Sequence, residues 1–336
     1  MQVKSHITTQ RATHPVDERL EALQRWLAGP LESPDFALAP ASADASFRRY
    51  FRATLADGRS YVAMDAPPGK EDCRPFVHVA RLLLEAGVHA PRVHAQDLEQ
   101  GFLLLEDLGH TTFLEALNEA NAGALMRDAI AALLKWQLAT RPGELPPYDE
   151  PLLRRELALF PEWYLGRHLG RKPGAALDSV FDTLVQSALA QPAVYVHRDY
   201  MPRNLMLSEP NPGVLDFQDA VVGPITYDIA SLTRDAFLSW EEERVLDWTA
   251  RYWEGAKKAY LPVAPDFAEF WRAFEWMGLQ RHLKVLGIFA RINYRDGKPR
   301  YLADTPRFLR YVRDVCKRYS ALAPLNRLLD ELKCES

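Results

Sequence analysis

The sequence predicts an α+β protein with a small, strand-rich N-terminal lobe and a larger, mainly helical C-terminal lobe. Short β-prone stretches gather before residue 106, whereas long segments with helical periodicity follow residue 121. The chain has 336 residues, of which 48% are hydrophobic, so it can bury a large core and should divide into two lobes. A junction at residues 106–109 gives expected lobes of 1–109 and 110–336.

The first expected element of the N-terminal lobe is a short amphipathic helix. Pro15 precedes its apolar residues, which include Leu20, Leu23 and Leu27, and Gly29 ends it. A second helix is expected at residues 73–86. The strands are expected at residues 36–41, 47–55, 61–64, 92–95 and 101–105.

The C-terminal lobe shows helical periodicity in six segments, with Pro or Gly between several of them. They are residues 122–140, 152–169, 175–190, 240–260, 267–292 and 304–319. The proline-rich stretch 141–151 is expected to form a loop between two of these helices.

Residues 197–217 carry the chemistry, and they read H-R-D-Y-M-P-R-N-L-M-L-S-E-P-N-P-G-V-L-D-F. Asn204 follows Asp199 by five positions, and Asp216 follows Asn204 by twelve. One carboxylate can accept a proton from an attacking hydroxyl, while a second carboxylate and an amide oxygen are hard ligands for Mg²⁺ on phosphates. The set indicates phosphoryl transfer from a metal nucleotide, although Asp and Asn in proline-rich loops also commonly cap turns. The H-R-D-x-x-x-x-N spacing resembles the catalytic loop of protein kinases.

Neighbouring residues predict how this loop is held. The β-prone residues 193–196 precede it, and Pro202 prevents a regular helix or ladder from continuing. Turn residues separate two short apolar strands, 205–207 and 213–215, so a hairpin should bring Asn204 and Asp216 together. His197 is expected to be a buried hydrogen-bonding residue and not a second base.

Composition argues against several classes of partner. The net charge of −4 speaks against a nucleic-acid surface, because phosphate-backbone binding depends on clustered Lys and Arg. The cysteines, Cys73, Cys316 and Cys334, lack C-x-x-C spacing, so reduced thiols and no zinc site are expected. The N-terminus lacks the apolar core of a signal peptide, and no apolar run approaches the roughly 20 residues that span a bilayer. We therefore expect no nucleic-acid or membrane partner and a cytoplasmic location.

Together these motifs resemble the aminoglycoside phosphotransferase branch of the protein-kinase-like fold, and the resemblance covers nearly the whole chain. It rests on the strand-rich N-terminal lobe, E-D-L-G at 106–109, H-R-D-x-x-x-x-N, L-D-F and Y-D-I-A-S-L at 227–232. Four longer sequence segments resemble the anomeric sugar kinases that phosphorylate N-acetylmuramate and N-acetylglucosamine at C1 in peptidoglycan recycling. These segments are D-A-S-F-R-R-Y-F-R at 44–52, M-D-A-P-P at 64–68, L-L-L-E-D-L-G at 103–109 and L-D-F-Q-D-A-V-V-G-P at 215–224.

The resemblance implies a bilobal protein-kinase-like fold and a role for each residue of the motif. Asp199 would be the catalytic base in transfer from ATP, and Asn204 and Asp216 would bind Mg²⁺. Asp228 would brace the catalytic loop and would not touch the substrate. An anomeric hydroxyl is more acidic than an ordinary alcohol, so a carboxylate of modest basicity can accept its proton.

In the N-terminal lobe the resemblance implies contacts with the nucleotide. The loop of residues 43–47, with Ser46 and Phe47 at its end, would cover the phosphates, although a plain β-turn reads the same way. The adenine would meet backbone groups of the junction, namely Glu106, Asp107 and Leu108.

Two departures from the protein-kinase pattern matter. Residues 61–65 contain no Lys to meet the α- and β-phosphates. Arg48 and Arg49 offer replacement cations, of which Arg49 is the expected nucleotide contact, although a strand Arg is often solvated. Gln218 replaces the Gly that follows D-F, which should limit flipping of that loop.

The acceptor site is expected on residues 278–295. Arg281 and Lys284 are the proposed contacts for an acceptor carboxylate, but Arg281 and Arg295 lie about 21 Å apart along a helix, so one pocket cannot hold every cation of this segment. Three tryptophans could stack on sugar faces, although Trp in helices usually belongs to a core. They are Trp163, Trp271 and Trp276.

Three functions remain open from the sequence. The first is an ATP- and Mg²⁺-dependent kinase for the C1 hydroxyl of N-acetylmuramate and N-acetylglucosamine. The second is a phosphotransferase for another small acceptor, such as an aminoglycoside, choline or homoserine. The third is a nucleotide-binding module without catalysis, which the absent strand Lys favours and the motif residues oppose. The sequence does not define the oligomeric state or the preferred sugar.

Overall fold

The computed structural model describes residues 17–42, 47–172, 174 and 176–333. The chain forms two compact units that alternate along the sequence. The first comprises Met1–Arg74 and Val93–Asp107, and the second comprises Pro75–Arg92 and Leu108–Ser336. The first unit is strand-rich and the second mainly helical, so the α+β fold class is confirmed. Lobes of 1–109 and 110–336 stay a prediction.

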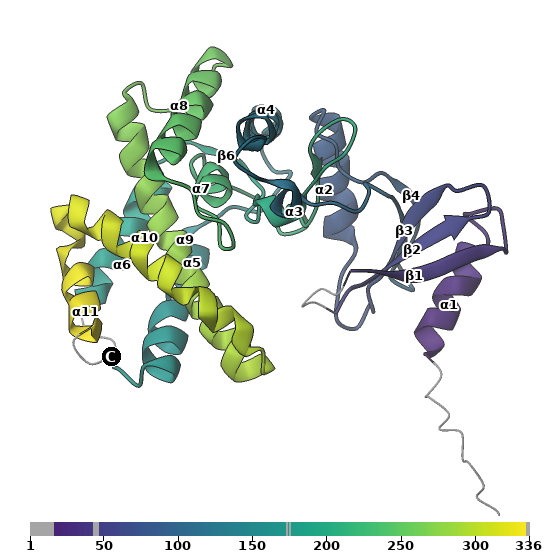
Figure 1. Cartoon of the computed structure of the whole chain (residues 1–336), viewed down its shortest axis with the longest axis horizontal. Helices are drawn as coiled ribbons and strands as arrows, with labels where there is room; N and C mark the ends of the chain where they lie inside the picture. The colour runs from purple at the N-terminus through teal and green to yellow at the C-terminus, as the bar shows by residue number, and fades with distance from the viewer. Residues whose placement is uncertain (1–16, 43–46, 173, 175, 334–336) are drawn as a thin grey trace, which may run out of the picture. The chain divides into compact units, whose positions relative to one another are not determined.

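The first unit is a five-stranded antiparallel sheet in the order β1-β2-β3-β5-β4 (Figure 1). Helix α1 (Glu18–Leu27) begins after Asp17, whose side chain accepts a hydrogen bond from the Leu20 N–H. The predicted strands are present, with ends shifted by at most two residues. They are β1 (Phe36–Ser42), β2 (Arg49–Leu55), β3 (Ser60–Asp65), β4 (Val93–Asp97) and β5 (Phe102–Glu106).

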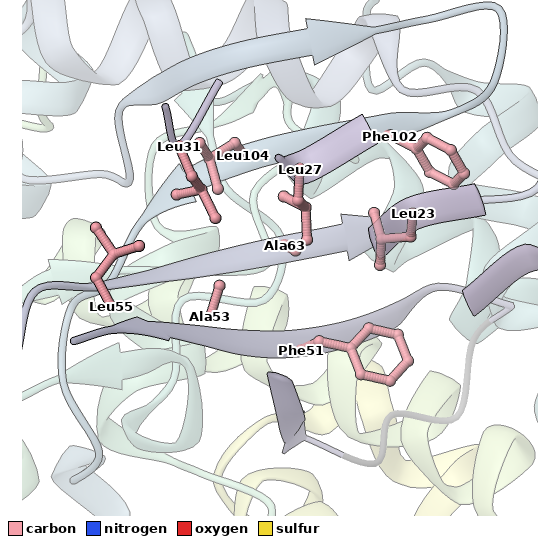
Figure 2. Close-up of a cluster of buried hydrophobic side chains, with 9 residues drawn as sticks. All are labelled: Leu23, Leu27, Leu31, Phe51, Ala53, Leu55, Ala63, Phe102 and Leu104. Atoms are coloured by element: carbon pink, nitrogen blue, oxygen red, sulfur yellow. The ribbon is translucent and has the colours of Figure 1, made fainter. Parts of the chain in front are cut away.

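One face of this sheet packs against α1. Side chains alternate along a strand, so Phe51, Ala53 and Leu55 of β2 share a face, and Leu23 and Leu27 of α1 pack there. Figure 2 shows the cluster, which also contains Leu31, Ala63, Phe102 and Leu104. The alternate residues of β2 therefore point to the opposite face of the sheet.

The second unit is built mainly from helices. The longest, α9 (Phe267–Asp296), contacts α5, α6, α7, α8, α10, η1 and η3. In the described ranges, no helix is long and apolar enough to cross a membrane. The remaining helices are α2 (Arg74–Glu85), α3 (Phe113–Ala116), α4 (Ala122–Leu138), α5 (Glu150–Leu157), η1 (Phe160–His168), α6 (Ala176–Leu189), α7 (Tyr227–Thr233), α8 (Glu242–Lys258), η3 (Pro299–Asp304), α10 (Thr305–Arg318), η4 (Ser320–Leu322) and α11 (Ala323–Lys333).

Two small strand pairs hold the motif of residues 197–217. Strand β6 (Ala193–Val196) pairs with β9 (Val221–Pro224), so both ends of the motif are fixed by one ladder. Inside it, the 3₁₀ turn η2 (Pro202–Asn204) leads into β7 (Leu205–Met206), which pairs with β8 (Gly213–Val214). The predicted hairpin is confirmed, although its strands are shorter than expected.

The helical segment predicted at residues 152–169 is present, but it is not one uniform α-helix. Helix α5 ends at Leu157, and η1 is a π-helix whose last turn closes with a bond from Leu169 N to Tyr164 O. Pro161 near the start of η1 has no N–H to donate, so the α-helical ladder cannot run through it. Helix α7 was not predicted because all seven of its residues are buried, which removes the polar and apolar periodicity of a surface helix.

Gly287→Ala should destabilise the second unit. A Cβ at Gly287 would lie 2.4 Å from the Leu159 carbonyl, so α9 and η1 would have to move apart. We expect the free energy of unfolding to fall by about 1–3 kcal/mol. Gly278→Ala in the same helix is the matched control, since its Cβ would meet Ala230 at an ordinary 3.8 Å and should gain up to about 1 kcal/mol of helix propensity. Chemical denaturation measures both, and equal stabilities would contradict this packing.

Candidate active site

The predicted catalytic loop begins where β6 ends, and a buried carboxylate holds its backbone. Asp228, at the start of α7, is fully buried and accepts hydrogen bonds from His197 N at 2.7 Å and Arg198 N at 3.0 Å. Arg198 has a φ of 76°, a left-handed conformation that is unusual for a residue with a side chain. Asp228 therefore fixes the backbone immediately before Asp199, and its expected bracing role is confirmed.

The burial of Asp228 has an electrostatic cost. Desolvation raises the pKa of its carboxyl to about 7, although the two backbone donors and the charge of Arg281 act in the opposite direction. The hydrogen bonds to both carboxyl oxygens offset part of the loss of water. The carboxyl is thus used for structure and is buried away from solvent.

His197 is a structural residue, as expected. Its side chain is buried, and its Nε2 lies 3.1 Å from the Leu215 carbonyl oxygen. Burial lowers the pKa of His197 to about 4, so the ring is neutral near pH 7 and can donate to that carbonyl. The contact ties the catalytic loop to the segment that precedes Asp216.

Asn204 and Asp216 lie together beside the backbone of Asp199. Asn204 Nδ2 is 2.9 Å from the Asp199 carbonyl oxygen and 3.3 Å from Asp216 Oδ2. The backbone adds a bond from Leu215 N to Asn204 O at 2.9 Å. The structure thus brings the predicted motif residues into one cluster within the second unit.

The position of Asp216 is fixed by the residues that follow it. Asp216 has a φ of 63°, and Gln218 Nε2 donates to its Oδ1 at 2.9 Å. Phe217 is fully buried, with its ring centre 4.7 Å from that of Phe76. Gln218, the departure from the kinase pattern, therefore orients the proposed metal ligand.

A buried ionic network adjoins the catalytic loop. Glu156 of α5 accepts hydrogen bonds from Arg198, from Lys284 Nζ at 2.9 Å, and from the Tyr148 hydroxyl. Burial alone would raise the pKa of Glu156, but the charges of Lys284 and Arg198 lower it to about 2. Arg198 also donates to the Asp219 carbonyl oxygen at 3.3 Å. Two cations and one anion thus share a site next to Asp199.

The two predicted acceptor contacts lie on α9 and are mostly buried. Lys284 Nζ is 3.2 Å from the Tyr227 hydroxyl. Burial lowers the pKa of Lys284, but Tyr227 and Glu156, with a smaller contribution from Asp199, raise it overall. Arg281 is 3% exposed, and its Nη1 has no hydrogen-bond partner in the described part of the chain. Its charge lowers the pKa of the buried Asp235, although desolvation raises that pKa overall.

Two of the three tryptophans considered for sugar stacking make aromatic contacts within the protein. Trp271 stacks on Phe274 with ring centres 5.0 Å apart, and Trp276 meets Tyr319 edge-on at 5.6 Å. Trp163 lies on the π-helix and is partly exposed. These contacts fit core packing, which is the usual role of Trp in helices.

Three of the predicted nucleotide contacts, Ser46, Phe47 and Arg49, belong to the first unit. Phe47 is 59% exposed, and Ser46 lies outside the described residues. Arg49 binds the carboxylates of Asp17 and Asp65.

The predicted junction of residues 106–109 begins at Glu106, the last residue of β5. Asp107 binds Arg52 at two points, with distances of 2.6 and 2.9 Å. Leu108, the first residue of the second unit in this part of the chain, has a buried side chain.

Sequence reasoning missed Glu156. The signal was available, because Glu156 lies between Leu153 and Leu157, which form the buried face of the short amphipathic α5. A carboxylate on an apolar helix face must be paired or protonated, so it marks a buried ionic contact. Its partners come from distant segments and could not be read from α5 alone.

The chemistry of the donor set fits a hard divalent cation. Asp216 and Asn204 offer carboxylate and amide oxygens, which are the ligands that Mg²⁺ accepts alongside water and phosphate. Asn204 directs its amide nitrogen towards Asp199 O and Asp216, so metal binding would use Oδ1.

The chain matches known proteins over most of its length. The model of the phosphotransferase enzyme family matches residues 37–270. Relatives named N-acetylmuramate/N-acetylglucosamine kinase are 57% identical in Pseudomonas aeruginosa, 55% in Pseudomonas putida and 52% in Neisseria meningitidis. Each alignment covers 94% of this chain, and 97%, 97% and 96% of the relative, respectively.

Solved structures share the fold at low sequence identity. A choline/ethanolamine kinase family protein from Mesorhizobium loti is 18% identical with a TM-score of 0.59, and the match covers 92% of this chain and 99% of that protein. An ADP-bound aminoglycoside phosphotransferase is 13% identical with a TM-score of 0.56, and the match covers 88% and 98%. The motif cluster, the family match and these relatives agree, and the chain belongs to the phosphotransferase enzyme family.

Proposed function

We propose that this protein transfers the γ-phosphoryl group of ATP to the C1 hydroxyl of N-acetylmuramate and N-acetylglucosamine. The observation that carries the proposal is the cluster of Asp199, Asn204 and Asp216 in a chain at least 52% identical to three relatives named as kinases of these sugars. We place the reaction in the cytoplasm and in the recycling of cell-wall sugars.

In this mechanism, positioning and charge do most of the catalytic work. The acceptor oxygen bonds to the γ-phosphorus while the bond to the β,γ-bridging oxygen breaks, and ADP leaves. Asp199 accepts the proton of the hydroxyl. Asp216 and Asn204 would hold Mg²⁺, which would neutralise charge on the phosphates when bound. Arg198 and Asp228 hold the loop so that Asp199 needs little reorganisation during the reaction.

We propose that side chains of α9 bind the polar groups of the acceptor. Lys284 is supported by its place beside the loop, where it shares the Glu156 carboxylate with Arg198, and Arg281 by its buried Nη1 without a hydrogen-bond partner among the described residues. A lactyl carboxylate, as in N-acetylmuramate, suits such cations. For the nucleotide we assign Ser46, Phe47 and the backbone of residues 106–108.

Amino sugars should be the acceptors in a direct assay. Purified protein with Mg–ATP is incubated with N-acetylmuramate, N-acetylglucosamine, an aminoglycoside, choline or homoserine, and ³¹P NMR locates the new ester. We expect phosphate on C1 of the two amino sugars, because the α9 segment offers cations and not the acidic surface that a cationic acceptor needs. Phosphorylation of only a cationic acceptor would contradict the proposal.

Asp199→Asn should remove the proton acceptor and leave the fold intact. We expect kcat to fall by roughly 10²–10⁴-fold, the usual range for loss of general-base catalysis. A coupled ADP assay measures the rate, and thermal melting checks the fold. Asp178→Asn, an exposed acid in the first turn of α6, is the control and should keep wild-type kcat. Unchanged turnover in Asp199→Asn would rule out the assigned base.

Asp216→Asn should weaken the response to Mg²⁺. Replacing a carboxylate by an amide removes a negative ligand, so the Mg²⁺ concentration at half-maximal rate should rise at least about tenfold. Titration of Mg²⁺ at saturating ATP measures this. Glu209→Gln, an exposed acid in the turn between β7 and β8, should leave the titration unchanged. The same midpoint in Asp216→Asn and wild type would show that Asp216 is not a ligand.

A further inference from the structure

The third strand of the sheet lacks the cation that protein kinases use for the nucleotide phosphates. In those enzymes a lysine on this strand meets the phosphates, and a glutamate pairs with it. Strand β3 contains no Lys or Arg, and its last residues, Met64 and Asp65, are fully buried. If the protein uses ATP as proposed above, another cation of the first unit must take this role.

Arg49, the cation expected from the sequence, is committed to a different partner. Its Nε lies 2.9 Å from Asp65 Oδ2, and its outer nitrogens contact Asp17. Asp65 also accepts from Arg19 Nε at 2.9 Å. The carboxylate of Asp65 is fully buried and needs a nearby opposite charge, which Arg49 supplies. The Arg49 guanidinium also packs over the ring of Phe51. If Arg49 moved to a ligand, Asp65 would lose one of its two cationic partners.

Arg48 has a different setting. It stands one residue before β2, and its Nη2 lies 3.1 Å from Glu71 Oε2. Both side chains are mostly buried, with 13% and 17% exposed. Burial lowers the pKa of Arg48, but electrostatic interactions with Tyr50 and Glu71, together with hydrogen bonds to both, raise it overall above its usual value. Arg52, two residues beyond Tyr50, is instead bound at two points by Asp107.

The strand register places Arg48 beside the end of β3. Tyr50 is the cross-strand partner of Met64, and directly paired residues point to the same face of a sheet. Arg48 contacts Tyr50 and therefore lies at this face, opposite the one that α1 covers. An arginine and a glutamate thus pair beside the strand on which protein kinases carry their lysine.

We propose that Arg48, oriented by Glu71, binds the phosphates of the nucleotide in place of the absent strand lysine. Glu71 takes the part of the helix glutamate of protein kinases, but it comes from the turn before α2. The planar donors of a guanidinium match phosphate oxygens in two-point contacts. Lys70, whose Nζ lies 4.4 Å from the ring centre of Phe47, brings a second positive charge to the same neighbourhood.

Nucleotide binding tests this assignment without any catalytic readout. Calorimetric titrations compare Mg–ADP with adenosine, which has the same base and sugar but no phosphate. Arg48→Gln should weaken Mg–ADP on the order of 10–100-fold and leave adenosine within about twofold, because only charge-assisted contacts to phosphate are lost. Arg48→Lys should recover part of the ADP affinity, and Glu71→Gln should weaken ADP less than Arg48→Gln does.

Arg49→Gln is the matched control, one residue away in the same strand end. It should keep the wild-type affinity for Mg–ADP and lower the melting temperature, since Asp65 loses one of its two cations. The assignment is overturned by unchanged ADP affinity in Arg48→Gln, by an equal loss for ADP and adenosine, or by the same ADP loss in Arg49→Gln. Should Arg48→Gln not fold, Arg48→Lys and Glu71→Gln provide the same comparison of ADP with adenosine.

The result is separable from the proposed acceptor. A wild-type protein that binds Mg–ADP but phosphorylates no amino sugar contradicts the acceptor assignment and leaves the role of Arg48 to be decided by the variants. A wild-type protein that binds neither ADP nor ATP overturns both.

Discussion

The active-site geometry depends on one buried carboxylate. Asp228 accepts both backbone N–H groups of His197 and Arg198 and so holds Arg198 in a left-handed conformation. Without these bonds, two buried N–H donors would lose their partner, and the free-energy cost of the left-handed conformation of Arg198 would not be offset. The proposed base, Asp199, is the next residue. Its place is therefore set by a helix thirty residues away in the sequence.

Charge balance reinforces this arrangement. Glu156 lies between Arg198 and Lys284, so the side chain before the proposed base is held by a second carboxylate from another helix. Each group of such a network depends on the others, because removal of one partner leaves an uncompensated charge in a place with little water. Gln218 likewise orients the side chain of Asp216, in this case by a hydrogen bond from a neutral amide. The proposed base and metal ligand are thus oriented by neighbouring side chains.

Local patterns predicted the elements well where one face meets solvent. Helix α1, the strands of the first sheet and the β7–β8 hairpin follow from alternation, periodicity and turn residues. Prediction failed where burial removed the pattern, as in α7, which is buried on all sides. For residues 152–169, periodicity predicted a helix correctly but not the change from α5 to the π-helix η1, which contains Pro161 and lies next to the close approach of Gly287 to Leu159. Such features depend on partners that a local window does not contain.

The sequence by itself determined the fold class and the identity and spacing of Asp199, Asn204 and Asp216, because residue type and local turn chemistry fix which ligands and bases are at hand. Only the tertiary structure decided which charges are already paired. Arg48 and Arg49 are adjacent and chemically identical, yet strand alternation sends one towards Glu71 and the other towards the buried Asp65. The role of Glu156 was also decided only by the tertiary structure, because its partners lie on a distant loop and helix. The energy of a buried charge depends on the groups that surround it.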